Sequence, residues 1–179
     1  MAFGFRPIGN VSGEKHVAVN EYTITAGAAA IYAGDPVIAA TDGSITVAAA
    51  TNPITGIFAG CKYINAKGEL VVSPNYDAPT SPTEITALVY DDPDTIFEVL
   101  ANADVTAANI GAQYDFVYAA GSAVNGVSGV TLGISTLGTT GGAFRMQKIT
   151  SSVGANARIV SGVWSEHVLK GVVAGVGGV

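Results

Sequence analysis

The most constraining feature of this sequence is a succession of short apolar and β-branched runs separated by turn-forming residues. Between residues 114 and 169 the runs YDFVYAA, VTLGISTL, AFRMQKI and ARIVSGVWSEHVL alternate with clusters of Gly, Ser and Asn. Short strands spaced by about 8–12 residues are typical of an all-β sandwich or barrel. We therefore predict a mainly β chain: a barrel or sandwich of short antiparallel strands, with one short helix and extended terminal arms.

A similar pattern appears between residues 30 and 64. Three apolar runs are separated by Asp42-Gly43 and Asn52-Pro53, which are strong turn signals, so a small meander is expected here. The glycine-bounded phrases IYAGDPV and IFAGCKYI in this segment suggest related strands. Cys61 is the only cysteine and lies in an apolar run, which predicts a buried structural thiol and excludes an intramolecular disulfide.

The expected organisation is an N-terminal arm with a first strand over residues 1–30, followed by a single β-rich domain over residues 31–179. Two subdomains, 31–72 and 84–179, are an alternative division, joined by the proline-rich loop SPNYDAPTSPT. One segment favours a helix. Asp104 is a suitable N-cap, VTAANI follows it, and Gly111 is a suitable stop, which predicts about two helical turns.

The stretch YDDPDTIFEV, residues 90–99, places three aspartates and a glutamate close together. Crowded carboxylates bind a hard cation when their spacing supplies enough oxygen ligands, but the spacing of a calcium-binding EF-hand loop is absent. The proline after Asp92 favours a turn, so we predict a solvated hairpin turn with Glu98 as a surface charge. The sequence leaves open whether Asp91, Asp92 and Asp94 bind a cation, and it predicts no cofactor.

Motifs of known catalytic chemistry are absent from the sequence. His16 and His167 are the only histidines, and neither lies in a local signature such as HExxH; a G-x-S-x-G elbow and a Walker phosphate loop are also missing. The glycine-rich stretches 121–129 and 137–144 are not followed by a predicted helix, so we interpret them as hairpin loops rather than phosphate cradles. The chain is therefore predicted not to be an enzyme and to have no catalytic residues.

Charge limits the possible partners. With 14 acidic and 8 scattered basic residues, the net charge of −6 argues against nucleic acid, which requires clustered Lys and Arg. The most apolar tract, VLKGVVAGVGGV, is too short and too glycine-rich to span a membrane, and the N-terminus lacks the pattern of a secretory signal. Only 12% of residues are charged, against about 25% on average, which predicts extensive burial against copies of the chain or another protein.

Both ends of the sequence are apolar. The segments MAFGFRP and GVVAGVGGV are expected to fray or aggregate unless they dock, so we interpret them as arms that lie on a neighbouring subunit. Aromatic residues and arginine concentrate in protein interfaces. The predicted partner contacts are Phe3, Phe5, Arg6, Pro7, Trp164 and His167.

Three segments, residues 1–13, 31–64 and 89–116, together resemble the small capsid decoration or cement proteins of short-tailed bacteriophages, including those that infect cyanobacteria. The resemblance implies a β-rich homo-oligomer, a trimer or a dimer, that is made in the bacterial host cytoplasm and occupies the outer capsid surface of the virion. Its partner would be the major capsid protein of HK97-like fold. Its function would be to clamp neighbouring capsomers and so stabilise the expanded shell.

Two other functions are compatible with the sequence. The first is a glycan-binding β-sandwich module or head fibre for host adhesion, which needs a platform of exposed aromatic side chains. The candidates for that platform are Tyr76, Tyr114, Tyr118 and Trp164. The second is a tail or portal-proximal structural protein of a phage, which copy number per particle would distinguish from a cement protein.

Overall fold

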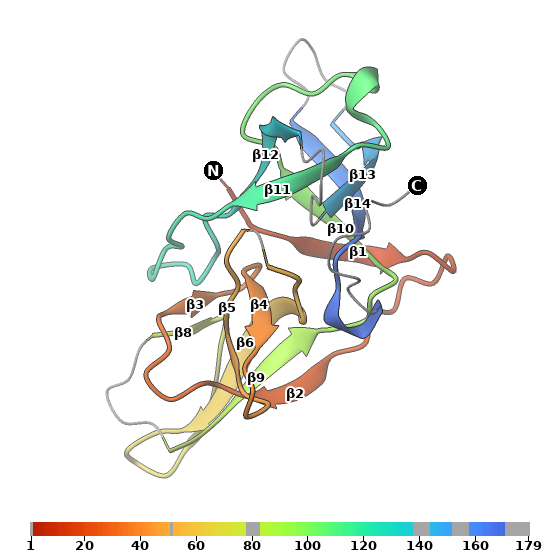
Figure 1. Cartoon of the computed structure of the whole chain (residues 1–179). Helices are drawn as coiled ribbons and strands as arrows, with labels where there is room; N and C mark the ends of the chain where they lie inside the picture. The colour runs from red at the N-terminus through yellow and green to blue at the C-terminus, as the bar shows by residue number, and fades with distance from the viewer. Residues whose placement is uncertain (1, 51, 78–82, 138–143, 152–157, 171–179) are drawn as a thin grey trace.

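A computed structural model of the chain describes residues 2–50, 52–77, 83–137, 144–151 and 158–170. The fold is mainly β with antiparallel sheets, as predicted. Within the described ranges no closed barrel forms and no helix reaches seven residues. Two larger sheets occupy the upper and lower parts of the molecule in Figure 1. No helix among the described residues is long and apolar enough to cross a membrane.

The upper sheet contains strands from both ends of the chain, and we call it the terminal sheet. Its order is β1-β10-β14-β13-β11-β12. The bounds are β1 (Arg6–Asn10), β10 (Thr95–Leu100), β11 (Gln113–Val117), β12 (Thr131–Leu137), β13 (Phe144–Ile149) and β14 (Ile159–Trp164). Along β10, Thr95, Phe97 and Val99 are buried while the alternate residues are partly exposed, the period of two expected for a strand with one face on a core.

An aromatic cluster, which we call the terminal core, lies under this sheet. Trp164 is its centre: its ring centroid lies 4.6 Å from that of Phe5, 5.4 Å from Phe144 and 6.0 Å from Phe116. All four side chains are at most 2% exposed. Tilted and edge-on ring pairs of this kind add stabilisation beyond the buried area itself.

The lower sheet is built from residues 20–90, and we call it the meander sheet after the segment that was predicted to form a meander. Its order is β2-β9-β6-β4-β5, with β7 paired to the remaining length of β6. The bounds are β2 (Asn20–Thr23), β4 (Pro36–Ala39), β5 (Ile45–Val47), β6 (Gly56–Ile64), β7 (Leu70–Ser73) and β9 (Thr83–Tyr90). A separate pair is formed by β3 (Ile31–Tyr32) and β8 (Asn75–Tyr76).

The hairpin predicted at Asp42-Gly43 is confirmed, but the predicted meander is wrong, because β4 rather than β5 lies next to β6. β4 pairs with β5 across the Asp42-Gly43 turn and with β6 on its other side. The meander core beneath this sheet consists of aliphatic side chains together with Phe58, Tyr76 and Cys61. Cys61 is fully buried, as expected, and desolvation, with the nearby Asp77 carboxylate, raises the pKa of its thiol to about 11.

The acidic stretch is not a hairpin turn, contrary to the prediction. β9, before it, belongs to the meander sheet, and β10, after it, belongs to the terminal sheet. Residues 91–94 are therefore a crossover between sheets. The proline-rich segment leads from β8 into β9, and its residues 78–82 lie outside the described residues.

The predicted two-turn helix is also wrong. A single 3₁₀ turn, η1 (Ala107–Asn109), occupies its place. The Asp104 carboxylate accepts a hydrogen bond from Arg158 Nε at 2.8 Å, so it is engaged away from the turn. The Asn109 side chain accepts a hydrogen bond from Thr106 N at 2.8 Å, which closes the local structure after one turn.

The two predicted glycine-rich hairpin loops have different outcomes. Residues 121–129 lie between β11 and β12, which pair antiparallel, so the first prediction is confirmed. Most of the second stretch, 138–143, lies outside the described residues.

Candidate functional site

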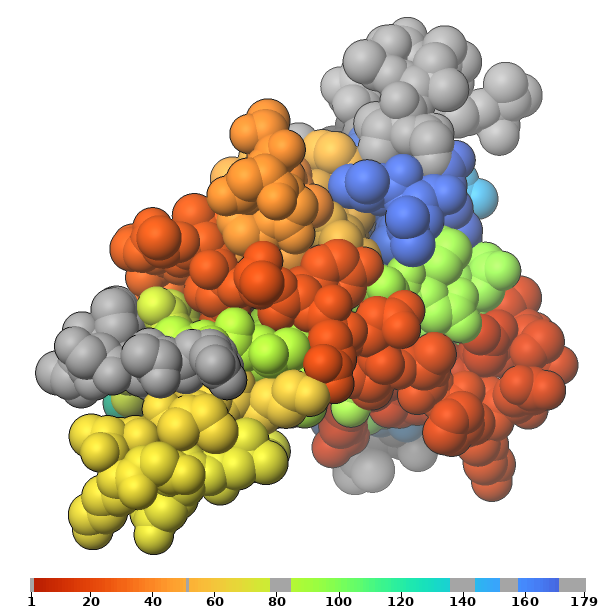
Figure 2. All heavy atoms as spheres, turned by 90° about the horizontal axis from the view of Figure 1, so that it is seen from below, coloured from red at the N-terminus to blue at the C-terminus, as the bar shows by residue number. Residues whose placement is uncertain are grey.

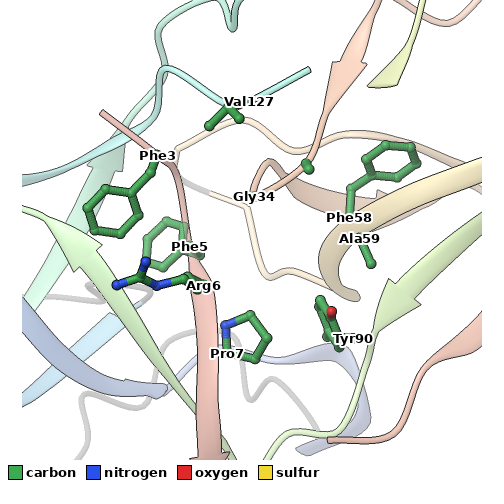
Figure 3. Close-up of a pocket in the computed structure, with 10 residues that line it drawn as sticks. Phe3, Phe5, Arg6, Pro7, Gly34, Phe58, Ala59, Tyr90 and Val127 are labelled. Carbon is green, nitrogen blue, oxygen red and sulfur yellow. The ribbon is translucent and has the colours of Figure 1, made fainter. Parts of the chain in front are cut away.

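A groove of about 270 Å³ lies where the N-terminal segment meets the meander sheet (Figure 3). One wall is the N-terminal segment, the opposite wall comes from β6 and the end of β9, and the loops before β4 and β12 complete the lining. The lining residues are Phe3, Phe5, Arg6, Pro7, Ala33, Gly34, Phe58, Ala59, Tyr90 and Val127.

Two glycines allow the N-terminal segment to lie directly against the loop before β4. Gly4 and Gly34 have φ angles of +66° and +96°, a region that favours glycine. A Cβ atom added to Gly4 would lie 2.6 Å from the Gly34 carbonyl oxygen, and one added to Gly34 would lie 2.8 Å from the Phe3 carbonyl oxygen. Phe5 N donates a hydrogen bond to Gly34 O at 2.9 Å. Backbone contacts therefore fix this wall of the groove.

Phe3 and Phe5, two residues apart, occupy different environments. Phe5 is 2% exposed and its ring belongs to the terminal core, whereas Phe3 is only partly buried. The buried ring of Phe5 anchors the segment. Phe3 and Pro7 are left at the groove with part of their surface open to solvent.

Arg6 places a positive charge at the edge of the groove. Its Cζ lies 4.9 Å from the centroid of the Phe3 ring, and the guanidinium pairs with Glu98 on the neighbouring strand β10. The Glu98 side chain is only 13% exposed, so it is a covered, paired charge rather than the surface charge that we expected.

The groove has the chemistry of a binding surface. Of its lining residues only Arg6 and Tyr90 carry a titratable side chain, and the lining contains no nucleophile with an adjacent base. Apolar walls with one cation at the edge suit an apolar side chain that has a carboxylate or carbonyl beside it.

The crossover of residues 91–94 is bonded to the chain's own polar groups. Asp91 is 5% exposed and accepts hydrogen bonds from Asn20 Nδ2 at 2.9 Å and from the Tyr22 hydroxyl at 2.6 Å. Burial, together with the Asp91 hydrogen bond and charge, raises the pKa of Tyr22 to about 12. This carboxylate therefore holds β2 against the crossover.

The other two aspartates of the crossover contact both ends of the chain. Asp92 accepts a hydrogen bond from Asn10 Nδ2 at 2.6 Å, and Asp94 pairs with Lys170 Nζ at 3.1 Å. Across the part of the chain that the structure describes, no group of three or more His, Cys, Asp or Glu side chains is placed to hold a metal ion. The visible role of the acidic stretch is to join segments.

His167 is buried where the C-terminal segment crosses the meander. Val168 N donates a hydrogen bond to Ile54 O at 2.9 Å, and the Nδ1 atom of His167 accepts one from Leu169 N at 3.2 Å. Desolvation, and then the charge of Lys170, lowers the pKa of the imidazole. His167 is therefore held as a neutral, structural side chain at neutral pH.

The structure divides the predicted partner contacts into two sets. Phe5, Trp164 and His167 are 2%, 1% and 2% exposed, so their side chains are covered within the chain itself. Phe3, Arg6 and Pro7 keep exposed surface and lie together along the groove. The predicted C-terminal arm, 171–179, lies outside the described residues.

The aromatic platform expected for a glycan-binding module does not form. Tyr76, Tyr114 and Trp164 are 5%, 0% and 1% exposed, which leaves only Tyr118, at 43%, of the predicted set. A sugar ring needs an open aromatic face to stack on, and three of these four side chains offer none.

Sequence reasoning missed the lining residues of the groove that lie outside the N-terminal segment. Gly34 and Phe58 belong to the two phrases IYAGDPV and IFAGCKYI. The structure bonds these phrases to each other: Gly34 N donates to Phe58 O at 2.8 Å, and Phe58 N donates to Asp35 O at 2.9 Å. The similarity of these two phrases was the sequence signal for the part of the groove that lies outside the N-terminal segment.

Comparison of the sequence with protein-family models and with curated proteins finds no match.

Proposed function

We propose that this chain is a phage head decoration, or cement, protein that binds the outer capsid surface and stabilises the expanded shell by clamping neighbouring capsomers. The resemblance of residues 1–13, 31–64 and 89–116 supplies the class of partner, the major capsid protein of HK97-like fold. The observation that carries the proposal is the groove formed around residues 3–7, because it gives the resembling N-terminal segment a preformed surface for docking.

The groove suits this role in three respects. Its wall is fixed by Phe5 and by the Gly4–Gly34 contact, so little conformational entropy is lost on binding. Its lining is mainly apolar, and Arg6 at the edge can orient an acidic or carbonyl group of the shell. The net charge of −6 suits an exterior position, away from packaged nucleic acid.

The mechanism is thermodynamic linkage and needs no chemistry. A protein that binds only the expanded lattice stabilises that lattice by its binding free energy. If one oligomer bridges several capsomers, each contact raises the effective concentration of the next, so modest single-site affinities are sufficient.

The experiment is co-sedimentation of the protein with expanded, decoration-free phage heads, followed by heating while DNA release is measured. We expect saturable binding at a copy number comparable to that of the capsid subunits, and release at a higher temperature. A few copies per particle would instead favour the tail or portal-proximal alternative. No binding would contradict the proposal and return attention to host glycans.

Groove variants locate the contact. Phe3→Ala combined with Arg6→Ala removes the exposed edge of the groove while leaving Phe5 in the core. Ile110→Ala is a matched control, because Ile110 is 46% exposed and does not line the groove. We expect the double variant to lose head binding and the control to retain it. Equal binding by both would show that the groove is not the contact with the shell.

A further inference from the structure

The edges of the two sheets differ in how they are protected. Each end strand of a sheet presents backbone N–H and C=O groups that can pair with another chain, and proteins usually block such edges with charge, proline, bulges or covering segments. Among the described residues, these two sheets have five edge strands, and four of them carry such a block.

In the terminal sheet, β1 contains Pro7 and has a register shift between Pro7 and Gly9. The other end strand, β12, is partly covered, because Asn102 N donates to Leu132 O at 2.9 Å and the Asn102 side chain accepts from Ile134 N at 3.0 Å. Both edges are therefore unsuited to uninterrupted pairing with another strand.

In the meander sheet, β2 is a polar edge on which Glu21 pairs with Lys62. The edge of β5 is covered, since Thr25 N donates to Ile45 O at 2.9 Å and Ile24 bridges Ile45. These two edges are also blocked.

The fifth edge strand, β7, has none of these devices within the part of the chain that the structure describes. Its sequence LVVS contains no charge and no proline, and its pairing with β6 runs from Cys61↔Ser73 to Ile64↔Leu70 without a register shift. Leu70 and Val72 are 66% and 70% exposed and share one face of the strand. Figure 2 shows the hairpin that carries β7, in yellow, projecting from the body at the lower left.

The hydrogen-bond pattern shows which groups this edge offers. In the turn, Asn65 N donates to Glu69 O at 3.0 Å, which makes 65 and 69 a hydrogen-bonded pair. Because such pairs alternate along an antiparallel ladder, Val71 and Ser73 point their backbone groups toward β6. Leu70 and Val72 therefore direct their N–H and C=O groups outward, where no described strand pairs with them.

We infer that β7 is a self-association edge, along which two copies of this chain pair antiparallel about a two-fold axis through Val71. In this register Leu70 of each copy faces the partner's Val72, so all four outward-facing residues form hydrogen-bonded pairs. The same four side chains are brought together on one face of the joined sheet.

A second copy is the occupant that this edge fits best. The pairing is self-complementary: the two apolar, outward-facing residues lie symmetrically about Val71, and the four-residue strand itself carries no charge that would be desolvated. Centring the axis on Val72 instead would bring Leu70 opposite the partner's Pro74, which has no N–H to donate. Centring it on Leu70 would bring Val72 opposite Gly68, which has no side chain to pack.

The interface is small, so we expect a concentration-dependent dimer rather than an obligate one. The inference is independent of the proposed function, because it requires no phage head. It nevertheless supplies the kind of bivalency from which a clamp would gain.

Cross-linking tests the register. Val71→Cys places a thiol opposite its own copy in a non-hydrogen-bonded pair, where the Cα atoms lie about 4.5 Å apart, within the range of a disulfide. Val124→Cys is the control, because Val124 is 99% exposed and lies in a loop; the native Cys61 is buried. We expect mild oxidation to give a covalent dimer of Val71→Cys well in excess of the control. Equal yields from the two variants would overturn the inference.

Charge substitution tests the edge without a covalent bond. In sedimentation velocity, the wild-type mass should rise toward that of a dimer with concentration. Leu70→Lys with Val72→Lys should stay monomeric, because each introduced cation faces another. Leu70→Glu with Val72→Lys should recover the dimer, because opposite charges then meet in both pairs. Unchanged thermal unfolding of each variant controls for folding. A wild type that stays monomeric would contradict the inference, and so would a dimer that persists in the variant with both lysines.

Discussion

The two cores of this protein differ in how far apart their side chains lie in the sequence, although residues 48–57 also contribute to the terminal core. The meander core is drawn from residues 28–89. The terminal core combines Phe5 with Phe144 and Trp164, side chains separated by most of the chain. The difference shows that the N-terminal segment has two roles: Phe5 completes a core, while Phe3 and Arg6 line an open groove.

The two roles of the N-terminal segment require separate tests. Deleting residues 1–10 would remove β1 and Phe5, so a loss of head binding would not separate docking from folding. Single substitutions can separate them.

The largest expected effect is that of Phe5→Ala. Removing a buried aromatic ring costs about 3–5 kcal/mol, and we expect the free energy of unfolding to fall by that amount. Urea unfolding followed by the fluorescence of Trp164 measures it. Phe3→Ala, two residues away, should cost about 1 kcal/mol or less. If both variants lose the same stability, Phe3 and Phe5 do not have separate roles.

The next effect concerns the crossover between the two cores. Asp91→Ala leaves the Tyr22 hydroxyl and the Asn20 amide without their acceptor, so we expect a loss of about 1–3 kcal/mol. In the same variant the pKa of Tyr22 should fall from about 12 toward its ordinary value near 10, as an NMR titration of the tyrosine rings would show.

Asp94→Ala is the control for that measurement. The Asp94 side chain is 60% exposed, and removing its pair with Lys170 should change stability by about 0–1 kcal/mol. A Tyr22 pKa unaffected by Asp91→Ala would contradict the assignment of Asp91 as the group that holds β2.

A smaller, pH-dependent effect comes from His167, where the C-terminal segment meets the meander. Burial lowers the pKa of His167 in the folded state, so the unfolded chain binds a proton more readily as the pH falls below about 6.5. Stability should therefore decrease as the pH is lowered through that region.

His167→Gln should remove this component of the pH dependence. The measurement is the thermal unfolding midpoint of wild type and variant as a function of pH between neutral and mildly acidic conditions. Parallel curves for the two proteins would show that His167 does not titrate on unfolding as described.

The smallest effect on stability is expected from Arg6→Ala. Arg6 is 60% exposed, and its pair with Glu98 should contribute about 0–1 kcal/mol. Head binding should nevertheless weaken, because the variant removes the charge at the edge of the groove. Head binding by Arg6→Ala equal to that of the wild type would show that Arg6 does not orient the shell at the groove.

Local features of the sequence predicted the hairpin around Asp42-Gly43 well, but not the order of its strands next to β6. The Asp42-Gly43 turn, the paired strands around it and the buried Cys61 all depend on neighbouring residues, which a short window of sequence contains. The mainly β fold followed from the spacing of the apolar runs.

The features that sequence reasoning missed depend on distant partners. A turn at Asp92-Pro93 shows that the chain changes direction, but whether β10 pairs with β9 or with β14 is decided by packing elsewhere. Asp104 looked like an N-cap because its partner, Arg158, lies 54 residues away. Phe5 was wrongly predicted to contact a partner for the same reason, because Phe144 and Trp164, which cover it, lie far away in the sequence.

The most direct test of the central claim is cryo-electron microscopy of expanded, decoration-free phage heads incubated with this protein. We expect density for the chain on the outer surface at junctions between capsomers, with Phe3, Arg6 and Pro7 facing the shell. Heads that remain bare at saturating protein, or density whose groove faces solvent, would contradict it.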